Sequence, residues 1–244
     1  MLSARRRRWM VAIAALAAAL STARLGSWQL DRAGQKLATQ AAIEDRARLP
    51  PIDQVEQLAT DAQTALAQHH RRLALSGHWS APHTVYLDNR QMNARSGFIV
   101  VTPLLLADGS ALLVQRGWMQ RDFQDRSRVA EVPAPAGEVT VQGRIAPPPT
   151  RLYDLGAGEG GRIRQNLDLD AFARETGLRL RPLSLLLTES AASGGDGLQR
   201  DWPAPNAGIE KNRGYAVQWF ALSALILVLY VWFQFIQPRR RARH

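Results

Sequence analysis

The chain of 244 residues is long enough for one substantial domain or two small ones, and its hydrophobic content of 46% is ordinary for a globular protein. Its net charge of +10 is concentrated at the ends, because removing eight terminal arginines leaves 23 basic against 21 acidic residues. Basic runs beside apolar segments are typical of membrane topology signals or anionic-lipid contacts, so the charge does not predict nucleic-acid binding. The absence of cysteine excludes disulfides, thiolate metal sites, iron–sulfur clusters and cysteine nucleophiles.

The first predicted element is an apolar segment that follows Arg5–Arg8. Residues 9–23 are apolar or small, and the segment reaches the length that crosses a bilayer if it extends to Leu30, with Arg24 reaching toward the interface. We expect a cytoplasmic basic tail at 1–8 and transmembrane helix 1 at 9–30. These residues alone leave a cleaved signal peptide open, because a basic start, an apolar middle and a small-residue step at 21–23 also fit one.

A mostly β domain with a few helices is predicted at 31–213. Helical spacing predicts that residues 30–48 continue out of the first span as far as Leu49-Pro50-Pro51, and that a second helix covers 52–68. Residues 168–176 read as a short helix between an Asn166 or Asp168 cap and Gly177. Apolar and alternating runs predict strands at 73–79, 84–87, 98–106, 111–119, 138–145 and 183–188.

Two local signals refine this prediction. Asp108-Gly109 lies between two apolar runs and predicts a β-hairpin. Pro103 lies inside the first of these runs and predicts an edge position or a bulge, because proline cannot donate a ladder hydrogen bond.

The last predicted element is transmembrane helix 2 at 214–236, followed by a cytoplasmic basic tail at 237–244. The segment carries no charge, is about 34 Å long as a helix, and has aromatic residues toward both ends. Since basic tails stay in the cytoplasm, the domain between the spans is expected on the opposite side, which is the periplasm in a bacterium. The predicted fold class is a membrane protein of the α+β type, with two transmembrane helices flanking a mostly β periplasmic domain with a few helices.

No catalytic constellation is visible in the sequence. The five histidines lack a metal-ligand spacing with carboxylates, and we find no nucleophile elbow, no phosphate-binding glycine loop and no zinc-protease motif. We therefore predict no catalytic residues, no metal site and no enzymatic activity.

Three stretches in order resemble one family. They are LGSWQLDRAGQK at 25–36, SGFIVVTPLLLADGSALLVQRGWM at 96–119 and YAVQWFALS at 215–223. Together they resemble the signatures of the Surfeit-locus family of cytochrome c oxidase assembly factors. The resemblance implies that both transmembrane helices are kept. It also implies a non-enzymatic, chaperone-like role in assembly of the haem–copper oxidase (respiratory chain complex IV), around haem a insertion into the catalytic subunit.

The resemblance also implies a location and partners. The protein is expected as a multi-pass protein of the bacterial inner (plasma) membrane, with both termini cytoplasmic and the central domain periplasmic. Expected partners are the cytochrome c oxidase catalytic subunit, other assembly factors and the lipid bilayer. A membrane-tethered periplasmic sensor or scaffold protein is the alternative function.

The motif residues are candidates for partner contact or haem handling. They are Trp28, Gln29, Arg32, Lys36, Gly97, Arg116, Gly117, Trp118, Asn212, Tyr215, Gln218 and Trp219. Structural roles stay open for them as well: interfacial anchoring for the span tryptophans, close packing for the glycines, Arg–aromatic bracing of the sheet, and lipid head-group contact for the basic pair on the first helix. Tyr215 and Gln218 share a helix face, and a polar residue inside a span usually meets protein or a ligand.

One position departs from the family pattern. Bacterial relatives carry a histidine three residues before the tyrosine of the second span, and it is their proposed haem ligand. This chain has Asn212 there. Imidazole binds haem iron well, whereas a side-chain amide is a poor ligand. Haem a is therefore a possible cofactor, but we do not expect tight axial ligation at this position.

Overall fold

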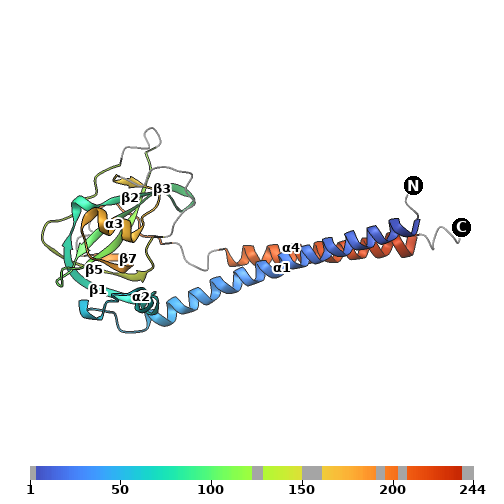
Figure 1. The fold of residues 1–244 in the computed structure, drawn as a ribbon, viewed down its shortest axis with the longest axis horizontal. Coiled ribbons are helices and arrows are strands. Elements are labelled where there is room, and N and C mark those ends of the chain that lie inside the picture. The colour runs from blue at the N-terminus through green and yellow to red at the C-terminus, as the bar shows by residue number, and fades with distance from the viewer. Residues whose placement is uncertain (1–3, 123–128, 150–160, 191–195, 203–207, 238–244) are drawn as a thin grey trace. The chain divides into compact units, whose positions relative to one another are not determined.

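The computed structural model describes residues 4–122, 129–149, 161–190, 196–202 and 208–237, and the chain divides into two compact units (Figure 1). The first unit, which we call the helix pair, contains residues 1–41 and 204–244. The second, which we call the domain, contains residues 42–203. The fold is α+β, with a mixed seven-stranded sheet and two long apolar helices.

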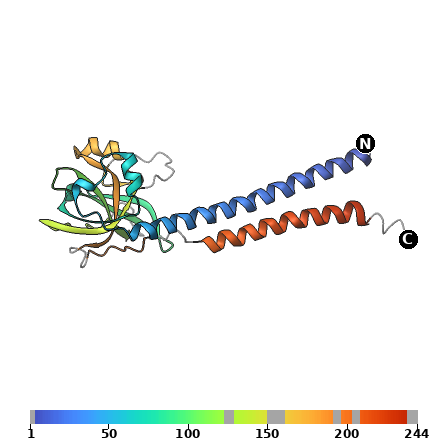
Figure 2. The same ribbon diagram turned by 90° about the horizontal axis from the view of Figure 1, so that it is seen from below.

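The helix pair is built from the two ends of the chain. Helix α1 runs over Ala4–Ala47, and α4 runs over Ile209–Val231 before a π-helical turn, η3, at Trp232–Ile236. The two helices run alongside each other (Figure 2). Each is long and apolar enough to cross a membrane. The predicted helical continuation beyond the first apolar segment is confirmed, and α1 ends ahead of the Pro50-Pro51 step.

The less exposed positions of the two helices form a seam. They recur every three or four residues, which is the spacing of a left-handed helix pair. On α1 they include Ala12, Ala15, Ala19, Thr22, Gly26, Gln29, Ala33 and Lys36, and on α4 they include Ile209, Asn212, Ala216, Trp219, Ser223, Ile226 and Tyr230. Small side chains allow close approach, and Ser223 Oγ donates a hydrogen bond of 2.9 Å to the carbonyl of Ala19.

The domain contains a sheet that closes on itself. Its strands are β1 (Arg72–Trp79), β2 (Val85–Met92), β3 (Arg95–Leu105), β4 (Ala111–Gln120), β5 (Glu138–Ala146), β6 (Ile163–Arg164) and β7 (Leu180–Ser190). The order is β1-β5-β7-β4-β3-β2-β6, and β1 also pairs with β3, so five strands form a ring. The β4–β7 and β2–β6 pairs are parallel, and the other pairs are antiparallel.

Apolar side chains fill the inside of the ring and pack against its extension in three clusters. The largest cluster joins β1, β3, β4, β5 and β7, with Leu73, Leu104 and Leu185 almost fully buried. A second cluster packs Phe172 of α3 (Leu169–Thr176) against strands β2, β3 and β4. As predicted, Asp168 caps α3 by accepting from Ala171 N at 2.9 Å, and Gly177 ends it with a φ of 69°.

The predicted helix over 52–68 is wrong in its first part. Only Ala62–Gln68 is α-helical (α2), after a single 3-10 turn, η1, at Val55–Gln57. Ile52 instead bridges to β1, accepting from Ala74 N and donating to Arg72 O. Its side chain is fully buried in the ring, so tertiary packing overrides the helical spacing.

The predicted hairpin is confirmed, but the prediction for Pro103 is not. Gly109 has a φ of 75° in the turn between β3 and β4. Strand β3 is not at an edge, and the irregularity in its pairing with β4 lies at Val100/Val101. The pairing of β3 with β2 ends at Val101, and its pairing with β1 begins at Leu104. Pro103 is tolerated because it lies where the partner strand changes, so its missing N–H interrupts no ladder there.

A further 3-10 turn, η2, at Ala81–His83 joins β1 to β2, and Pro82 lies within its first two positions. It lies next to α3 in space, because His83 and Thr176 line the same pocket.

Candidate functional site

The Arg116-Gly117-Trp118 motif lies on β4, next to a bulge. Gln115 and Gly117 pair with the consecutive residues Val101 and Val100, so Arg116 is the extra residue of the strand. Its side chain is 2% exposed and lies over Trp79, with Cζ 4.9 Å from the ring centroid. It donates a hydrogen bond of 2.6 Å to the carbonyl of Pro133. Burial lowers the pKa of Arg116, while the nearby carboxylate of Asp196, 3.9 Å away, favours the charged form.

Trp118 is buried beside two glycines that make room for it and its neighbours. Its indole Nε1 donates to the carbonyl of Arg90 at 2.9 Å. A Cβ on Gly97 would lie 2.5 Å from the Trp118 ring and would also overlap the carbonyl of Met119. A Cβ on Gly117 would lie 2.7 Å from Leu198 Cβ. Both glycines are therefore required by close approach, which is one of the structural roles open to them from the sequence.

The motif also fastens the segment at 196–202, which precedes α4 in the chain. Trp118 and Gln199 exchange two backbone hydrogen bonds of 2.7 and 2.8 Å. Asp196 forms an ion pair with Arg200 and lies near Arg116, and Trp202 Nε1 donates to the carbonyl of Leu187 at 2.8 Å. No sequence motif indicated this segment, because its partners lie far away along the chain.

Three candidate residues meet in the helix pair. Asn212 Nδ2 donates to Gln29 Oε1 at 2.7 Å, and Lys36 Nζ donates to Asn212 Oδ1 at 2.8 Å. We call Gln29, Lys36 and Asn212 the polar layer. Both ends of the Asn212 amide are used, so this residue links α1 to α4.

Four other candidates face away from the seam. Trp28 is 50% exposed with the Arg32 guanidinium 5.9 Å from its ring, and Tyr215 is 41% exposed with Lys211 Nζ 5.9 Å from its ring. Gln218 is exposed on the side of Tyr215. Trp219, by contrast, is half-buried in the seam. The candidates thus fall into a buried group in the domain, an inward group in the helix pair and an outward group.

The donor set at the start of α4 does not fit axial haem ligation. Over residues 4–41 and 208–237 the helix pair carries no histidine. The side chain at position 212 is an amide whose oxygen accepts from Lys36 and whose nitrogen donates to Gln29. An amide already bonded at both ends offers haem iron no imidazole, and its oxygen is a poor ligand for haem iron.

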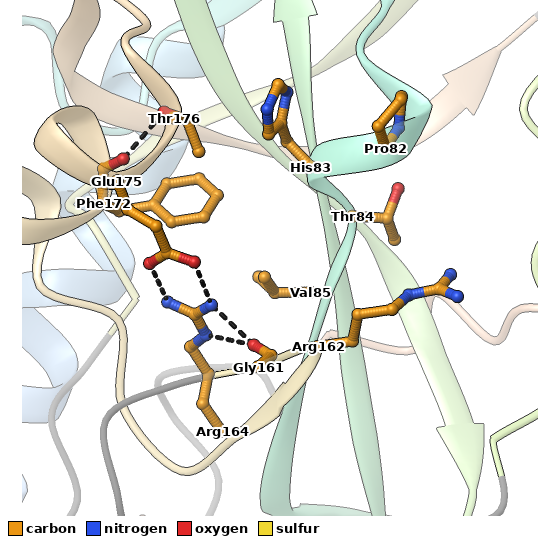
Figure 3. Close-up of a pocket in the computed structure, with 10 residues that line it drawn as sticks. All are labelled: Pro82, His83, Thr84, Val85, Gly161, Arg162, Arg164, Phe172, Glu175 and Thr176. Atoms are coloured by element: carbon orange, nitrogen blue, oxygen red, sulfur yellow. Dashed lines mark hydrogen bonds and ion pairs between the residues drawn. The ribbon is translucent and has the colours of Figure 1, made fainter.

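The domain has a pocket of about 210 Å³ that the sequence did not predict (Figure 3). Phe172 and Val85 line it together with charged groups that are already paired. Arg164 donates to both carboxylate oxygens of Glu175 at 2.9 Å, and these bonds lower the pKa of Glu175. His83 shares a hydrogen bond of 2.8 Å with Ser80 through Nδ1. In the part of the chain that the structure describes, no three His, Asp or Glu side chains cluster as metal ligands.

Comparison with known proteins gives the family. The model of the SURF1 family matches residues 16–224, a range that contains all three motif stretches. The chain belongs to the SURF1 family, as the resemblance implied.

Three relatives illustrate the range of similarity. A SURF1-like protein of Rickettsia bellii is 24% identical over 209 residues, which cover 84% of this chain and 83% of that protein. The Surfeit locus protein 1 of Arabidopsis thaliana is 30% identical over 114 residues, 43% of this chain and 32% of that protein. The cytochrome oxidase assembly protein SHY1 of Saccharomyces cerevisiae is 27% identical over 99 residues, 40% of this chain and 25% of that protein.

Replacing Gly97 should destabilise the domain. We expect Gly97→Ala to cost about 1–3 kcal/mol, because the new methyl group meets the Trp118 ring and a backbone carbonyl. Thermal unfolding of the purified protein, followed by tryptophan fluorescence, measures the loss. Gly34→Ala is the matched control, since no atom lies within 4 Å of its added Cβ. Equal melting temperatures for the two variants would contradict the packing role of Gly97.

Replacing Asn212 should loosen the helix pair. Asn212→Leu removes the hydrogen bonds that Gln29 and Lys36 make to residue 212, and we expect the helices to separate more often, by a factor of about two to ten. Because the chain has no cysteine, Ala19→Cys and Ser223→Cys can be introduced together as the only two thiols. The rate at which they form a disulfide measures how often the two helices are in contact at the seam. Gln218→Leu removes an outward amide from the same helix and should leave the rate unchanged. A rate unaffected by Asn212→Leu would show that the polar layer does not hold the helices together.

Proposed function

We propose that this protein is a membrane-anchored assembly factor for cytochrome oxidase. Membership of the SURF1 family over residues 16–224 carries the proposal, together with the name of the yeast relative as a cytochrome oxidase assembly protein. Within this function the protein contacts oxidase subunits, and we take the catalytic subunit and other assembly factors as its partners.

The distribution of apolar surface supports membrane insertion. In the described part of the chain, the large exposed apolar side chains lie on α1, α4 and η3, with Leu49 and Leu66 as the exceptions. Soluble proteins rarely expose continuous apolar surface of this extent, whereas lipid-facing helices require it. We propose that α1 and α4 cross the bacterial plasma membrane, with the arginine-rich termini in the cytoplasm and the domain in the periplasm.

The role we propose is non-enzymatic. The motif residues of the domain are buried, and Arg116 and Trp118 bond to Pro133, Arg90 and Gln199, so they brace the sheet and the 196–202 segment. The outward residues of the helix pair are aromatic, basic or amide side chains, which suit recognition of protein and lipid.

For haem a, we propose that this chain assists insertion into the catalytic subunit without holding haem tightly at residue 212. The two hydrogen bonds of the Asn212 amide support this proposal, because they give the residue a structural task between α1 and α4. The assembly role would then depend on contact with the oxidase rather than on stable haem storage at that position.

Deleting the gene tests the assembly role. We expect reduced-minus-oxidised spectra of membranes from the deletion strain to show a lower haem a signal, restored by the wild-type gene. Replacing the segment at 214–236 by an unrelated apolar span should not restore it. Full restoration by the replaced span would favour a tethered sensor or scaffold, and an unchanged haem a signal in the deletion strain would overturn the assembly role.

Haem occupancy tests the role of Asn212. We expect the wild-type protein, co-expressed with haem a synthesis enzymes, to be purified with little haem a, as read from its Soret band. Asn212→His should raise the occupancy because it supplies an imidazole. Gln218→His places an imidazole on the outward face of the same helix as a control and should not raise it. Stoichiometric haem a in the wild-type protein would contradict the weak binding that we propose.

A further inference from the structure

We propose that Arg24 binds a membrane-spanning helix of the oxidase that presents a carboxylate at its depth. This inference rests on the proposed function, since it takes α1 as a membrane span and the oxidase as the partner. Its starting point is a charge in an apolar helix that has no partner in the described chain.

Arg24 lies between Ala23 and Leu25 in the apolar part of α1, and its side chain is exposed. No hydrogen bond, ion pair or aromatic contact satisfies its guanidinium among the residues that the structure describes. Charged side chains within membrane helices are rare, and they almost always face protein or a water-filled cavity instead of lipid. An exposed, unpaired arginine at this place therefore indicates a surface that another protein covers.

The direction of α1 makes it hard for the Arg24 side chain to reach the nearer membrane surface. Arg24 is six residues from Leu30, about 9 Å along the helix, and fifteen from Trp9, about 22 Å. Side chains on a helix lean toward its N-terminus, so Arg24 leans away from the nearer end of the span and into the apolar region, which opposes the reach to the interface that we expected from the sequence. Gln218 on α4 differs, because its side chain leans toward Gly214, the nearer end of its own span.

The seam excludes α4 as the missing partner. Arg24 is two residues from Thr22 and two from Gly26, which both lie in the seam, so it points to the opposite side of α1. Leu20, four residues earlier, shares that side and is 62% exposed. Ile13 and Trp28 extend it at 64% and 50% exposure. We call Ile13, Leu20, Arg24 and Trp28 the Arg24 face, an apolar helix surface in which Arg24 is the central cation, with Arg32 beside Trp28 at its end.

The chemistry of the face defines its partner. A guanidinium has five donors, no acceptor and a permanent charge, so the partner must supply acceptor oxygens. An aspartate or glutamate on an otherwise apolar membrane helix supplies acceptor oxygens and a negative charge, and the contact with Arg24 compensates its own charge as well. A second copy related by a two-fold axis through this face would bring Arg24 against Arg24, which like-charge repulsion opposes.

Photo-crosslinking in native membranes tests the proposal. A photoreactive residue replaces Leu20 in the full chain, next to Arg24 but without removing it. We expect a crosslinked product with a membrane subunit of the oxidase, about tenfold weaker with Arg24→Leu and largely kept with Arg24→Lys. A photoreactive residue at Val217, which is 67% exposed on α4, is the control, and its products should not depend on residue 24. Immunoblots confirm equal amounts of each variant in the membrane.

Three results would overturn the proposal: crosslinks from Leu20 to lipid alone, crosslinks to a second copy of this chain, or an oxidase product unaffected by Arg24→Leu. Haem a spectra of the same strains separate this proposal from the proposed function. If gene deletion lowers the haem a signal but Arg24→Leu changes neither the signal nor the crosslink, only the docking proposal fails. If deletion leaves the signal unchanged, the assembly role itself fails.

Discussion

A polar group that is partly buried between two helices needs a hydrogen-bond partner, and the helix pair depends on this constraint. Asn212 meets it by joining Gln29 and Lys36, which lie 183 and 176 residues away in sequence. The small side chains along the seam allow α1 and α4 to approach, but small residues alone permit several registers. A single polar layer favours one register, since any shift of one helix along the other would break both hydrogen bonds of the Asn212 amide.

The domain contains a buried cation whose hydrogen bonding is incomplete, because Arg116 Nε and Nη1 have no hydrogen-bond partner among the residues that the structure describes. Arg116 is almost fully buried, and it remains tolerable because it stacks on Trp79, bonds to the Pro133 carbonyl and lies near Asp196. These contacts tie the bulge in β4 to residues from three other parts of the chain. The R-G-W motif thus has a structural role, and Gly117 allows the 196–202 segment to approach β4 closely.

The contacts of the helix pair and of the domain divide the motif residues into a structural group and an exposed group. Residues that bond inward, such as Gln29 and Asn212, build the protein, whereas the exposed residues Trp28, Arg32, Tyr215 and Gln218 are available to lipid and to other proteins. Asn212 fits this division, because an amide that donates and accepts at once is suited to linking two helices. The exposed residues, together with Arg24, are where an assembly partner would act.

The sequence by itself determined the α+β composition, the two apolar helices, the hairpin at Asp108-Gly109, the capped helix α3 and the family. These depend on local periodicity, turn chemistry and short motifs, which neighbouring residues specify. Only the tertiary structure decided that Ile52 joins the sheet, that Pro103 lies at a change of partner strand, and that β1 closes the ring onto β3. It also decided that Asn212 bonds to Gln29 and Lys36 while Arg24 is left exposed, because which groups meet depends on packing between distant segments that no local pattern encodes.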